Sequence, residues 1–413
     1  MDKALLVGLN TTKDSIEELK GLALALQIET VETVIQNNIK PNPRFYIGSG
    51  KVQEIKMMIN LYDIDIIIFD DPLSPAQLKN LTNEFDIQVI DRSFLILSIF
   101  SERAQTKEAV LEVSLAQKKY MLPRLIGLGI TLSRQGGGTY NAKGPGETKL
   151  ELDRRKLERE ISIIQSELSK IKKEKAISRK RRQKNNIPVV ALVGYTNAGK
   201  SSLMNTLASH LNNDTPKVLE KDMLFQTLDT KAKRLQKDNY PPFMLIDTVG
   251  FINKLPVELV TSFNSTLKDV INADLLLHIV DGANFDQKQI DVTKNILKDI
   301  KASDIERILV LTKKDQATSF PNITDDYLFI SNKTDENIDN LITTIYGHLY
   351  KDTRIMNLFI PYNRGAIIDT IKASSTILEL KQDEKGTYLR ALLTAEQISK
   401  YNYYLLKNSW IIL

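Results

Sequence analysis

One eight-residue stretch, Gly194-Tyr195-Thr196-Asn197-Ala198-Gly199-Lys200-Ser201, constrains the fold more than any other part of the chain. It follows a short apolar run at residues 188–193 and opens a helical pattern at residues 201–211. A strand, the spacing G-x-x-x-x-G-K-S and a helix together form the signature of a phosphate-binding loop. Glycine lets the backbone curl so that N–H groups point at phosphate oxygens, and the helix N-terminus adds a partial positive charge. The stretch therefore predicts a nucleotide-binding α/β domain.

The residues around this loop predict how the phosphates and Mg²⁺ would be held. We expect Lys200 to reach the β- and γ-phosphates and the Ser201 hydroxyl to bind Mg²⁺. Farther along, Thr227 can place its hydroxyl on Mg²⁺ and its N–H on the γ-phosphate. It lies in the stretch Phe225, Gln226, Thr227, Leu228 and Asp229.

A second phosphate-sensing motif follows the apolar run at residues 243–246. Its residues are Asp247, Thr248, Val249 and Gly250. Asp247 is expected to bind Mg²⁺ through water, and the Gly250 N–H to donate to the γ-phosphate. Loss of that phosphate would release both segments, which makes them a switch.

Two later motifs predict which base is bound. The first is Thr312, Lys313, Lys314 and Asp315, and the second is Ser331, Asn332 and Lys333. A buried Asp315 carboxylate can accept two hydrogen bonds from guanine, whereas adenine offers no matching pair of donors. Lys313 would cover the base face, and the backbone of the second motif would contact the base carbonyl. The motifs occur in order, each after a strand, and so predict GTP rather than ATP binding.

The residue after Gly250 bears on the rate of hydrolysis. It is Phe251, where many small signalling GTPases carry the glutamine that orients the attacking water. A phenyl ring cannot do this, so we expect slow intrinsic hydrolysis that a partner accelerates. His278 lies in an apolar strand pattern and His210 at a helix end, and both are expected to be structural.

Composition limits the remaining classes of function. The chain has 413 residues and no cysteine, so it has no disulfide or thiolate metal site. It lacks a signal-peptide pattern, and no apolar stretch approaches the ~20 residues that a membrane span needs. We therefore expect a cytoplasmic, monomeric protein without an integral membrane segment.

Alternating strand and helix patterns at residues 1–105 predict an N-terminal α/β domain with a mostly parallel sheet. Asp65, Asp70 and Asp71 lie near strand ends there, and we expect helix caps or solvated loop residues rather than a metal site. The nucleotide domain is expected at residues 186–352. A small α+β module is expected at residues 353–413, with strands at 355–360, 376–380 and 388–393 and helices between them.

Residues 106–185 predict an antiparallel helical hairpin that projects from the body. A helix from residue 106 is expected to end at a loop of residues 123–147, which contains seven of the eighteen glycines. A capping box of Thr148 and Glu151 would start the second helix. Its heptad seam consists of Leu150, Leu157, Ile161, Ile164, Leu168 and Ile171.

The charge of the chain is concentrated on this hairpin. The chain carries a net charge of +5, whereas residues 148–184 alone hold fourteen Lys or Arg against six Asp or Glu. The loop also offers Arg134, Lys143 and the aromatic ring of Tyr140. These features favour contact with the phosphate backbone and bases of RNA, and no feature indicates DNA. A solvated connector is the competing interpretation.

The residues also resemble a known family, the HflX group of translational GTPases. The likeness rests on the sequence GPGETKLE at residues 144–151, Asp153-Arg154-Arg155, the phosphate-binding loop, residues 225–229 and Asp247–Phe251. The resemblance implies that the N-terminal domain and hairpin bind ribosomal RNA of the large ribosomal subunit. It also implies ribosome-stimulated GTP hydrolysis that splits or rescues stalled ribosomes. Lys143 and Thr312 depart from the arginine and asparagine that are usual there.

Three functions remain open at this point. The first is a ribosome-binding GTPase that splits or recycles ribosomes. The second is an assembly GTPase that binds ribosomal RNA precursors. The third is a GTP-gated module for a protein partner, in which the hairpin is a coiled-coil interface.

Overall fold

A computed structural model of the chain divides into two compact units. Its described residues in the first unit are 1–37, 40–135, 145–172 and 252–254. Those in the second unit are 173–184, 187–211, 231–237, 240–251, 269–321 and 323–406. The chain thus passes from the second unit back to the first between Phe251 and Ile252. Among the described residues, no helix is both long and apolar enough to cross a membrane.

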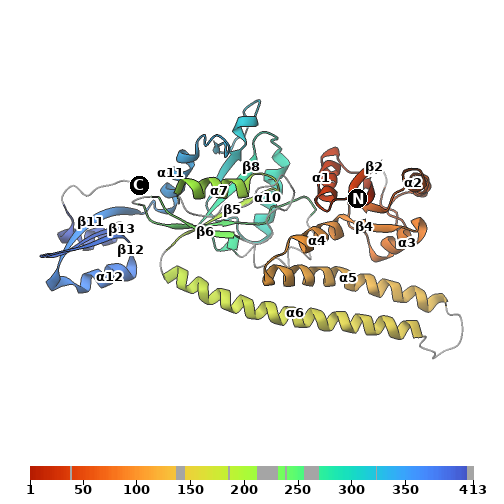
Figure 1. Ribbon diagram of the computed structural model, residues 1–413, viewed down its shortest axis with the longest axis horizontal. Coiled ribbons are helices and arrows are strands. Elements are labelled where there is room, and N and C mark those ends of the chain that lie inside the picture. Colours follow the sequence, from red (N-terminus) through yellow and green to blue (C-terminus); the bar gives the residue numbers. More distant parts are fainter. Residues whose placement is uncertain are drawn as a thin grey trace. The chain divides into compact units, whose positions relative to one another are not determined.

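The first unit contains a four-stranded parallel sheet in the order β2-β1-β3-β4 (Figure 1). Its strands are β1 (Lys3–Leu9), β2 (Glu29–Gln36), β3 (Ile66–Phe69) and β4 (Gln88–Asp91). Its helices are α1 (Lys13–Ala25), α2 (Ser49–Tyr62), α3 (Pro75–Phe85) and α4 (Arg92–Arg103). All four residues of β3 are buried, as expected for a strand that helices cover on both faces. The predicted N-terminal α/β fold is confirmed, and α4 is a helix that the sequence analysis missed.

Side-chain caps fix where these helices begin. The Thr12 hydroxyl accepts from the Ser15 N–H at the start of α1. Ser74 and Gln77 form a capping box at α3, and the Asp91 carboxylate caps α4. Each cap pairs a backbone N–H that the first helical turn leaves without a partner.

The predicted hairpin consists of α5 (Lys107–Gln135) and α6 (Pro145–Lys184). Leu115 of α5 is buried with Ile164 and Leu168 of α6, and Lys118 Nζ lies 2.5 Å from Glu160 Oε2. Lys107, earlier in α5, pairs with Glu167, later in α6, so the helices run antiparallel. The central part of the heptad seam is therefore confirmed.

The ends of the hairpin helices differ from the prediction. Helix α5 continues through Pro123 to Gln135, so the expected loop does not begin at Pro123. Proline within a helix is unfavourable, but the next residue anchors this turn: Arg124 donates to Tyr120 O, Leu73 O and Asp91. Helix α6 begins at Pro145, a favoured first residue, so Thr148 does not stand at its N-cap as expected. The glycine-rich residues 136–144 lie outside the described residues.

The second unit is built on a six-stranded sheet in the order β10-β9-β8-β5-β7-β6. Its strands are β5 (Val189–Gly194), β6 (Lys231–Leu235), β7 (Phe243–Asp247), β8 (Leu275–Asp281), β9 (Arg307–Thr312) and β10 (Tyr327–Phe329). Only the edge strand β6 is antiparallel among these described strands, and the rest are parallel. The predicted mostly parallel sheet of a GTPase domain is confirmed.

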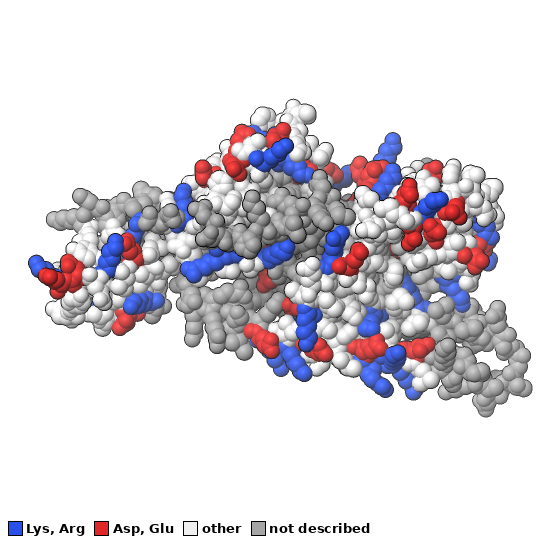
Figure 2. All heavy atoms as spheres, viewed as in Figure 1, with Lys and Arg blue, Asp and Glu red and all other residues white. Residues whose placement is uncertain are grey.

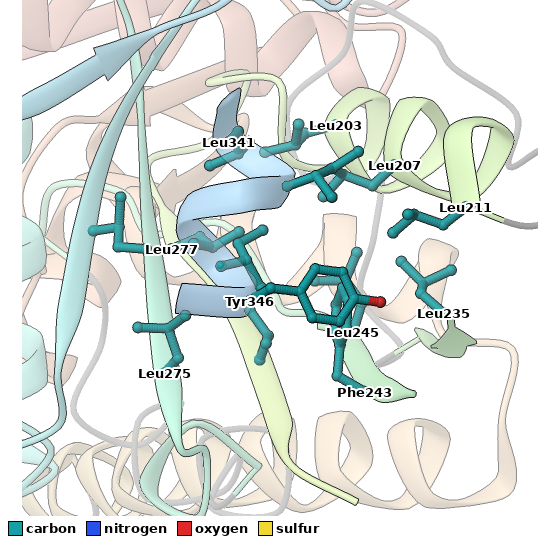
Figure 3. Packing of buried hydrophobic residues seen from close by; sticks show 14 of the residues in the cluster. Leu203, Leu207, Leu211, Leu235, Phe243, Leu245, Leu275, Leu277, Leu341 and Tyr346 are labelled. Atoms are coloured by element: carbon teal, nitrogen blue, oxygen red, sulfur yellow. The ribbon is translucent and has the colours of Figure 1, made fainter. Parts of the chain in front are cut away.

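Helices cover both faces of this sheet. On one face, α7 (Lys200–Leu211) and α11 (Ile338–Leu349) pack on strands β5, β7 and β8 through leucines and Tyr346 (Figure 3). On the other face, Ile290 of α10 (Gln287–Asp299) is buried with residues of β8, β9 and β10. Because the sheet is covered, its functional groups are left at the carboxyl ends of the strands.

A three-stranded antiparallel sheet in the order β11-β13-β12 follows. It comprises β11 (Thr353–Pro361), β12 (Thr376–Asp383) and β13 (Gly386–Thr394). Helix α12 (Ala366–Ser374) lies between β11 and β12, but β12 and β13 form a direct hairpin. The expectation of helices between all three strands is therefore wrong, and α13 (Ala395–Lys400) instead follows β13. Short 3-10 helices η1, η2 and η3 span Lys314–Gln316, Tyr362–Arg364 and Asn402–Tyr404.

Candidate nucleotide-binding site

The predicted phosphate-binding loop joins the carboxyl end of β5 to α7. Gly194 has φ of 149°, and a Cβ there would lie 2.1 Å from Ile279 O. Gly199 has φ of 88°, and Asn197 adopts the left-handed conformation at φ of 59°. Glycine accepts the conformations of residues 194 and 199, and the close approach at residue 194, without strain, which is why the loop needs glycine at both ends.

Lys200 is folded into this loop. Its Nζ donates to Gly194 O at 3.1 Å and to Tyr195 O at 2.6 Å. The residue is only 7% exposed. Burial lowers the pKa of the Lys200 ammonium to about 8, and the negative charge of Asp247 opposes this shift only in part. The loop therefore holds a cation whose charged form a bound phosphate would favour.

Ser201 and Asp247 meet because their strands are neighbours. Strands β5 and β7 are parallel, with Leu192 opposite Asp247, so their carboxyl ends lie at the same edge. Ser201 Oγ donates to Asp247 Oδ2 at 2.8 Å, and the Asp247 side chain is fully buried. The next residue, Thr248, donates from Oγ1 to Leu192 O at 2.6 Å. A hydroxyl beside a buried carboxylate is an oxygen donor set that suits Mg²⁺.

Gly250 lies directly against the phosphate-binding loop. A Cβ built on Gly250 would lie 2.8 Å from Thr196 Cα and 3.0 Å from Lys200 Nζ. The segment is then fixed by Phe251, whose N–H donates to Gly194 O at 3.0 Å and whose carbonyl accepts from Thr196 N at 2.9 Å. The predicted phosphate-sensing glycine and phosphate-binding lysine are thus brought together. Phe251 itself is buried, as a residue with a packing role would be.

Thr312 connects the first base-recognition motif to the phosphate-binding loop. Its Oγ1 donates to Ala198 O at 2.7 Å and lies 3.2 Å from Val280 O. Thr312, although shorter than the asparagine that is usual there, thus makes a hydrogen bond to the phosphate-binding loop. Lys313 Nζ donates to Asp281 Oδ2 at 2.8 Å, so the Lys313 side chain extends toward the end of β8.

Asp315 lies in η1, with one carboxylate oxygen held by the second motif. Ser331 Oγ donates to Asp315 Oδ1 at 2.7 Å and accepts from the N–H groups of Lys333 and Thr334. The Asp315 side chain is exposed, so the expectation of a carboxylate buried by the protein itself is wrong.

Lys314 and Asn332 face protein groups. The Lys314 N–H donates to Ile330 O at 3.1 Å, and its ammonium pairs with Glu336. Asn332 Nδ2 lies 3.5 Å from Gly199 O, while its backbone carbonyl lies 3.4 Å from Thr206 Oγ1. Asn332 thus links the second motif to the start of α7.

Sequence reasoning missed Asp281, the partner of Lys313. Its Oδ1 accepts from the N–H groups of Ala283 and Asn284, and its Oδ2 accepts from Lys313. An aspartate at the carboxyl end of the apolar strand β8 was the available signal. The predicted residues Phe225, Gln226, Thr227, Leu228 and Asp229 lie outside the described residues.

Neither histidine of this unit that the sequence singled out can replace a catalytic glutamine. His278 is buried in β8, where burial and the positive charges of Arg307, Lys294 and Lys200 lower its pKa to about 3. His210 Nε2 lies 3.3 Å from Asp335 Oδ1, at the end of α7 opposite the phosphate-binding loop.

The described part of the hairpin carries mixed charge. On the face in Figure 2, acidic and basic side chains alternate along α5 and α6. Residues 151–174 hold seven Lys or Arg and six Asp or Glu, so they contribute little of the basic excess. Most of that excess lies at residues 175–184, whose side chains are outside the described set.

Three family models match consecutive parts of the chain. The model described as GTP-binding GTPase N-terminal matches residues 13–101, and that for the GTP-binding GTPase Middle Region matches residues 103–182. The third, described as 50S ribosome-binding GTPase, matches residues 189–313.

Curated proteins resemble the whole chain. It is 40% identical over 399 residues to GTPase HflX of Caldanaerobacter subterraneus subsp. tengcongensis, covering 96% of this chain and 92% of that protein. It is 35% identical over 398 residues to GTPase HflX of Escherichia coli K12, covering 94% and 92%. A solved structure, a GTP-binding protein from Sulfolobus solfataricus in complex with GDP, is 25% identical with a TM-score of 0.44, covering 85% and 99%.

Proposed function

The chain belongs to the HflX family of ribosome-associated GTPases, and from this premise we propose that it uses GTP to split or rescue stalled and idle ribosomes. The observation that carries the proposal is the position of Gly250. It lies against Thr196 and Lys200, so the glycine proposed to sense the γ-phosphate and the lysine proposed to bind it are next to each other. Binding or loss of one phosphate group would then change the conformation of this segment.

We propose the following roles for the nucleotide-site residues. The loop from Gly194 to Ser201 binds the phosphates, with Lys200 on the β- and γ-phosphates. Asp315, oriented by Ser331, accepts two hydrogen bonds from guanine and becomes buried against the base. Lys313 covers the base face, and the backbone of residues 331–333 contacts the base carbonyl.

Mg²⁺ fits the oxygen groups at the end of β7. Ser201 Oγ and Asp247 Oδ2 are 2.8 Å apart, and Mg²⁺ prefers few protein ligands together with water and phosphate oxygens. We propose that Ser201 and Thr227 would hold the ion directly and Asp247 through water. When bound, the ion neutralises charge that develops on the phosphate oxygens during hydrolysis.

Phe251 supports slow intrinsic hydrolysis. It stands where a water-orienting glutamine would be, and its buried ring has no group that can hold a water. The ribosome would therefore supply or order the missing polar group, and hydrolysis would follow ribosome engagement. A cytoplasmic location follows from this proposed partner.

The first unit and the hairpin would provide the contact with the large subunit. We propose four parts: an N-terminal domain at residues 1–105, a hairpin at 106–185, a GTPase domain at 186–352 and a C-terminal module at 353–413. The basic residues 179–184 would neutralise phosphates of ribosomal RNA, which makes binding strongly dependent on salt. All of these proposed contacts come from one copy of the chain, so we propose that the protein acts as a monomer.

Sucrose-gradient sedimentation tests the proposal. Whole ribosomes are incubated with the protein and either GDP or a non-hydrolysable GTP analogue. The analogue should convert ribosomes into subunits and bring the protein to the large subunit, whereas GDP should do neither. Replacing Arg179, Lys180, Arg181 and Arg182 with glutamine should weaken this binding. Replacing four lysines of the C-terminal module with glutamine should not, namely Lys372, Lys381, Lys385 and Lys400.

Two outcomes would contradict the splitting function. Ribosomes that stay whole while the protein sediments with precursor particles would indicate an assembly GTPase. Sedimentation with no particle in any nucleotide state would indicate a GTP-gated module for a protein partner.

A further inference from the structure

A buried ion cluster lies at the carboxyl edge of the four-stranded sheet in the first unit. Asp70 follows β3 and Arg92 follows β4, and both side chains are fully buried. Arg92 donates to Asp70 Oδ1 from Nε at 3.0 Å and from Nη2 at 2.5 Å, and from Nη1 to Glu18 Oε2 at 2.9 Å. The hydroxyls of Ser15 and Thr11 donate to the same Asp70 carboxylate. Asp70 is therefore neither the helix cap nor the solvated residue expected from sequence.

Lys254 completes this cluster from a distant part of the sequence. Its Nζ donates to Asp70 Oδ2 at 2.6 Å and to Asp71 Oδ1 at 2.5 Å. Asp71 also accepts from the Tyr46 hydroxyl at 2.5 Å. The backbone of Lys254 has φ of 55°, in the left-handed region that residues other than glycine rarely adopt. The segment therefore has a defined conformation where the lysine enters the cluster.

Charge balance explains why a lysine is held there. Glu18, Asp70 and Asp71 bring three carboxylates, which Arg92 and Lys254 partly neutralise. Burial by itself opposes ionisation of Asp70, but Arg92 and Lys254 outweigh it and hold the pKa of that carboxyl below its usual value. Without Lys254, the three carboxylates would face a single guanidinium, which costs free energy at a buried position.

The cluster lies where the strand order of the sheet reverses. Open α/β sheets bind ligands outside the carboxyl ends of their strands, where the strand order reverses. In this sheet the order β2-β1-β3-β4 reverses between β1 and β3. Thr11 follows β1 and Asp70 follows β3, and the cations that contact Asp70 there are the chain's own Arg92 and Lys254.

Lys254 lies only four residues after Gly250. Upstream, Phe251 is hydrogen-bonded to Gly194 and Thr196 of the phosphate-binding loop. Downstream, Lys254 is fastened to Asp70 and Asp71. Since an extended residue spans at most about 3.6 Å, the few residues between Gly250 and Lys254 limit how far one can move without the other.

We propose that Lys254, held by Asp70 and Asp71, is a positioning residue for GTP hydrolysis. It fixes the segment that starts at Gly250, so that the Gly250 N–H stays where it can meet the γ-phosphate. This inference rests on the proposed role of Gly250 in sensing GTP. Because coupling between two sites is reciprocal, a GTP-dependent shift of Gly250 also changes how firmly the first unit holds Lys254.

Single-turnover hydrolysis without ribosomes tests this role. In Lys254→Ala, the rate constant at saturating GTP should fall about tenfold, as expected for loss of one charge-assisted hydrogen bond. The affinity for GDP should stay within about twofold, because Gly250 serves the γ-phosphate, which GDP lacks. Lys254→Arg, which keeps the charge, should recover most of the rate.

The matched control is Lys56→Ala in the same unit. Lys56 pairs with Glu84 at 2.5 Å but has no connection to the Gly250 segment, so its removal should leave hydrolysis unchanged. Asp71→Asn provides a second variant that leaves the buried Arg92–Asp70 pair intact, and it should lower the rate about threefold.

Unchanged hydrolysis in Lys254→Ala or Asp71→Asn, with only a lower thermal midpoint, would refute the proposal. Equal losses of GTP and GDP affinity with an unchanged rate constant would refute it as well. If the proposed ribosome function is wrong, a separate measurement will show it, because ribosomes will not stimulate GTP hydrolysis by the wild-type protein.

Discussion

Nucleotide binding above pH 8 should take up a proton at Lys200. Its Nζ is buried in the phosphate-binding loop and bound to two backbone carbonyls, and burial lowers its pKa to about 8. A phosphate bound next to the ammonium favours the charged form and should return the pKa toward 10.5. Protein that has lost this proton must therefore regain it when GDP binds.

The size of the effect follows from the pKa. At pH 8.5, about three quarters of the free protein would have a neutral Lys200, whereas at pH 7 only about a tenth would. GDP should therefore bind with uptake of about 0.7 proton at pH 8.5 and about 0.1 at pH 7. The phosphate groups, with a pKa of about 6, contribute almost no proton at the higher pH.

Isothermal titration calorimetry in buffers of different ionisation enthalpy measures this number. The observed binding enthalpy should rise or fall linearly with the buffer enthalpy, with a slope equal to the protons taken up. Lys200→Arg is the control, because a guanidinium stays charged at both pH values and its uptake should be near zero. Equal uptake by the wild-type protein at pH 7 and 8.5 would refute the reasoning.

Three further predictions concern other residues of the candidate nucleotide site. In Gly250→Ala, the new Cβ would meet Thr196 Cα at 2.8 Å, so single-turnover GTP hydrolysis should fall at least about tenfold while GDP binding, followed by fluorescence, changes little. In Thr312→Val, Ala198 O loses its 2.7 Å hydroxyl donor, and GDP affinity from calorimetry should fall about fivefold. In Asp315→Asn, an amide replaces the carboxylate that we propose accepts from guanine, so competition binding should show a switch of preference from GDP toward xanthosine diphosphate. Unchanged hydrolysis, affinity or base preference, respectively, would contradict each assignment.

The meeting of Ser201 and Asp247 could be predicted from sequence because each lies just after an apolar strand. Parallel strands bring their carboxyl ends to one edge of a sheet, so residues far apart in sequence meet there. Ser201 and Asp247 are 46 residues apart and form a 2.8 Å hydrogen bond in this way. The spacing of the motifs and the strand pattern were therefore enough to predict that these two residues meet.

The hairpin shows where local sequence rules fail. Pro123 is a normal signal for the end of a helix, yet α5 continues for twelve residues beyond it. The contacts of Arg124 with Leu73 and Asp91 stabilise this turn, and they depend on residues 51 and 33 positions away. A helix pattern cannot contain that information.

The Lys254 cluster could not be predicted from sequence either. Lys254 and Asp70 are 184 residues apart, and an aspartate after a strand is normally a cap or a solvated residue. The only local signal was Arg92, a charged residue two positions before the largely apolar residues 94–100. Such a residue is buried only when it is paired, so it could have indicated an acidic partner.

The rate of GTP turnover with and without ribosomes tests the central claim most directly. The claim is that a GTPase site with Phe251 at the position of the usual water-orienting glutamine depends on the ribosome to become active. The account predicts slow turnover by the protein alone and an increase of at least about a hundredfold with ribosomes, which added salt should diminish. Rapid turnover by the isolated protein, unaltered by ribosomes at low salt, would contradict it.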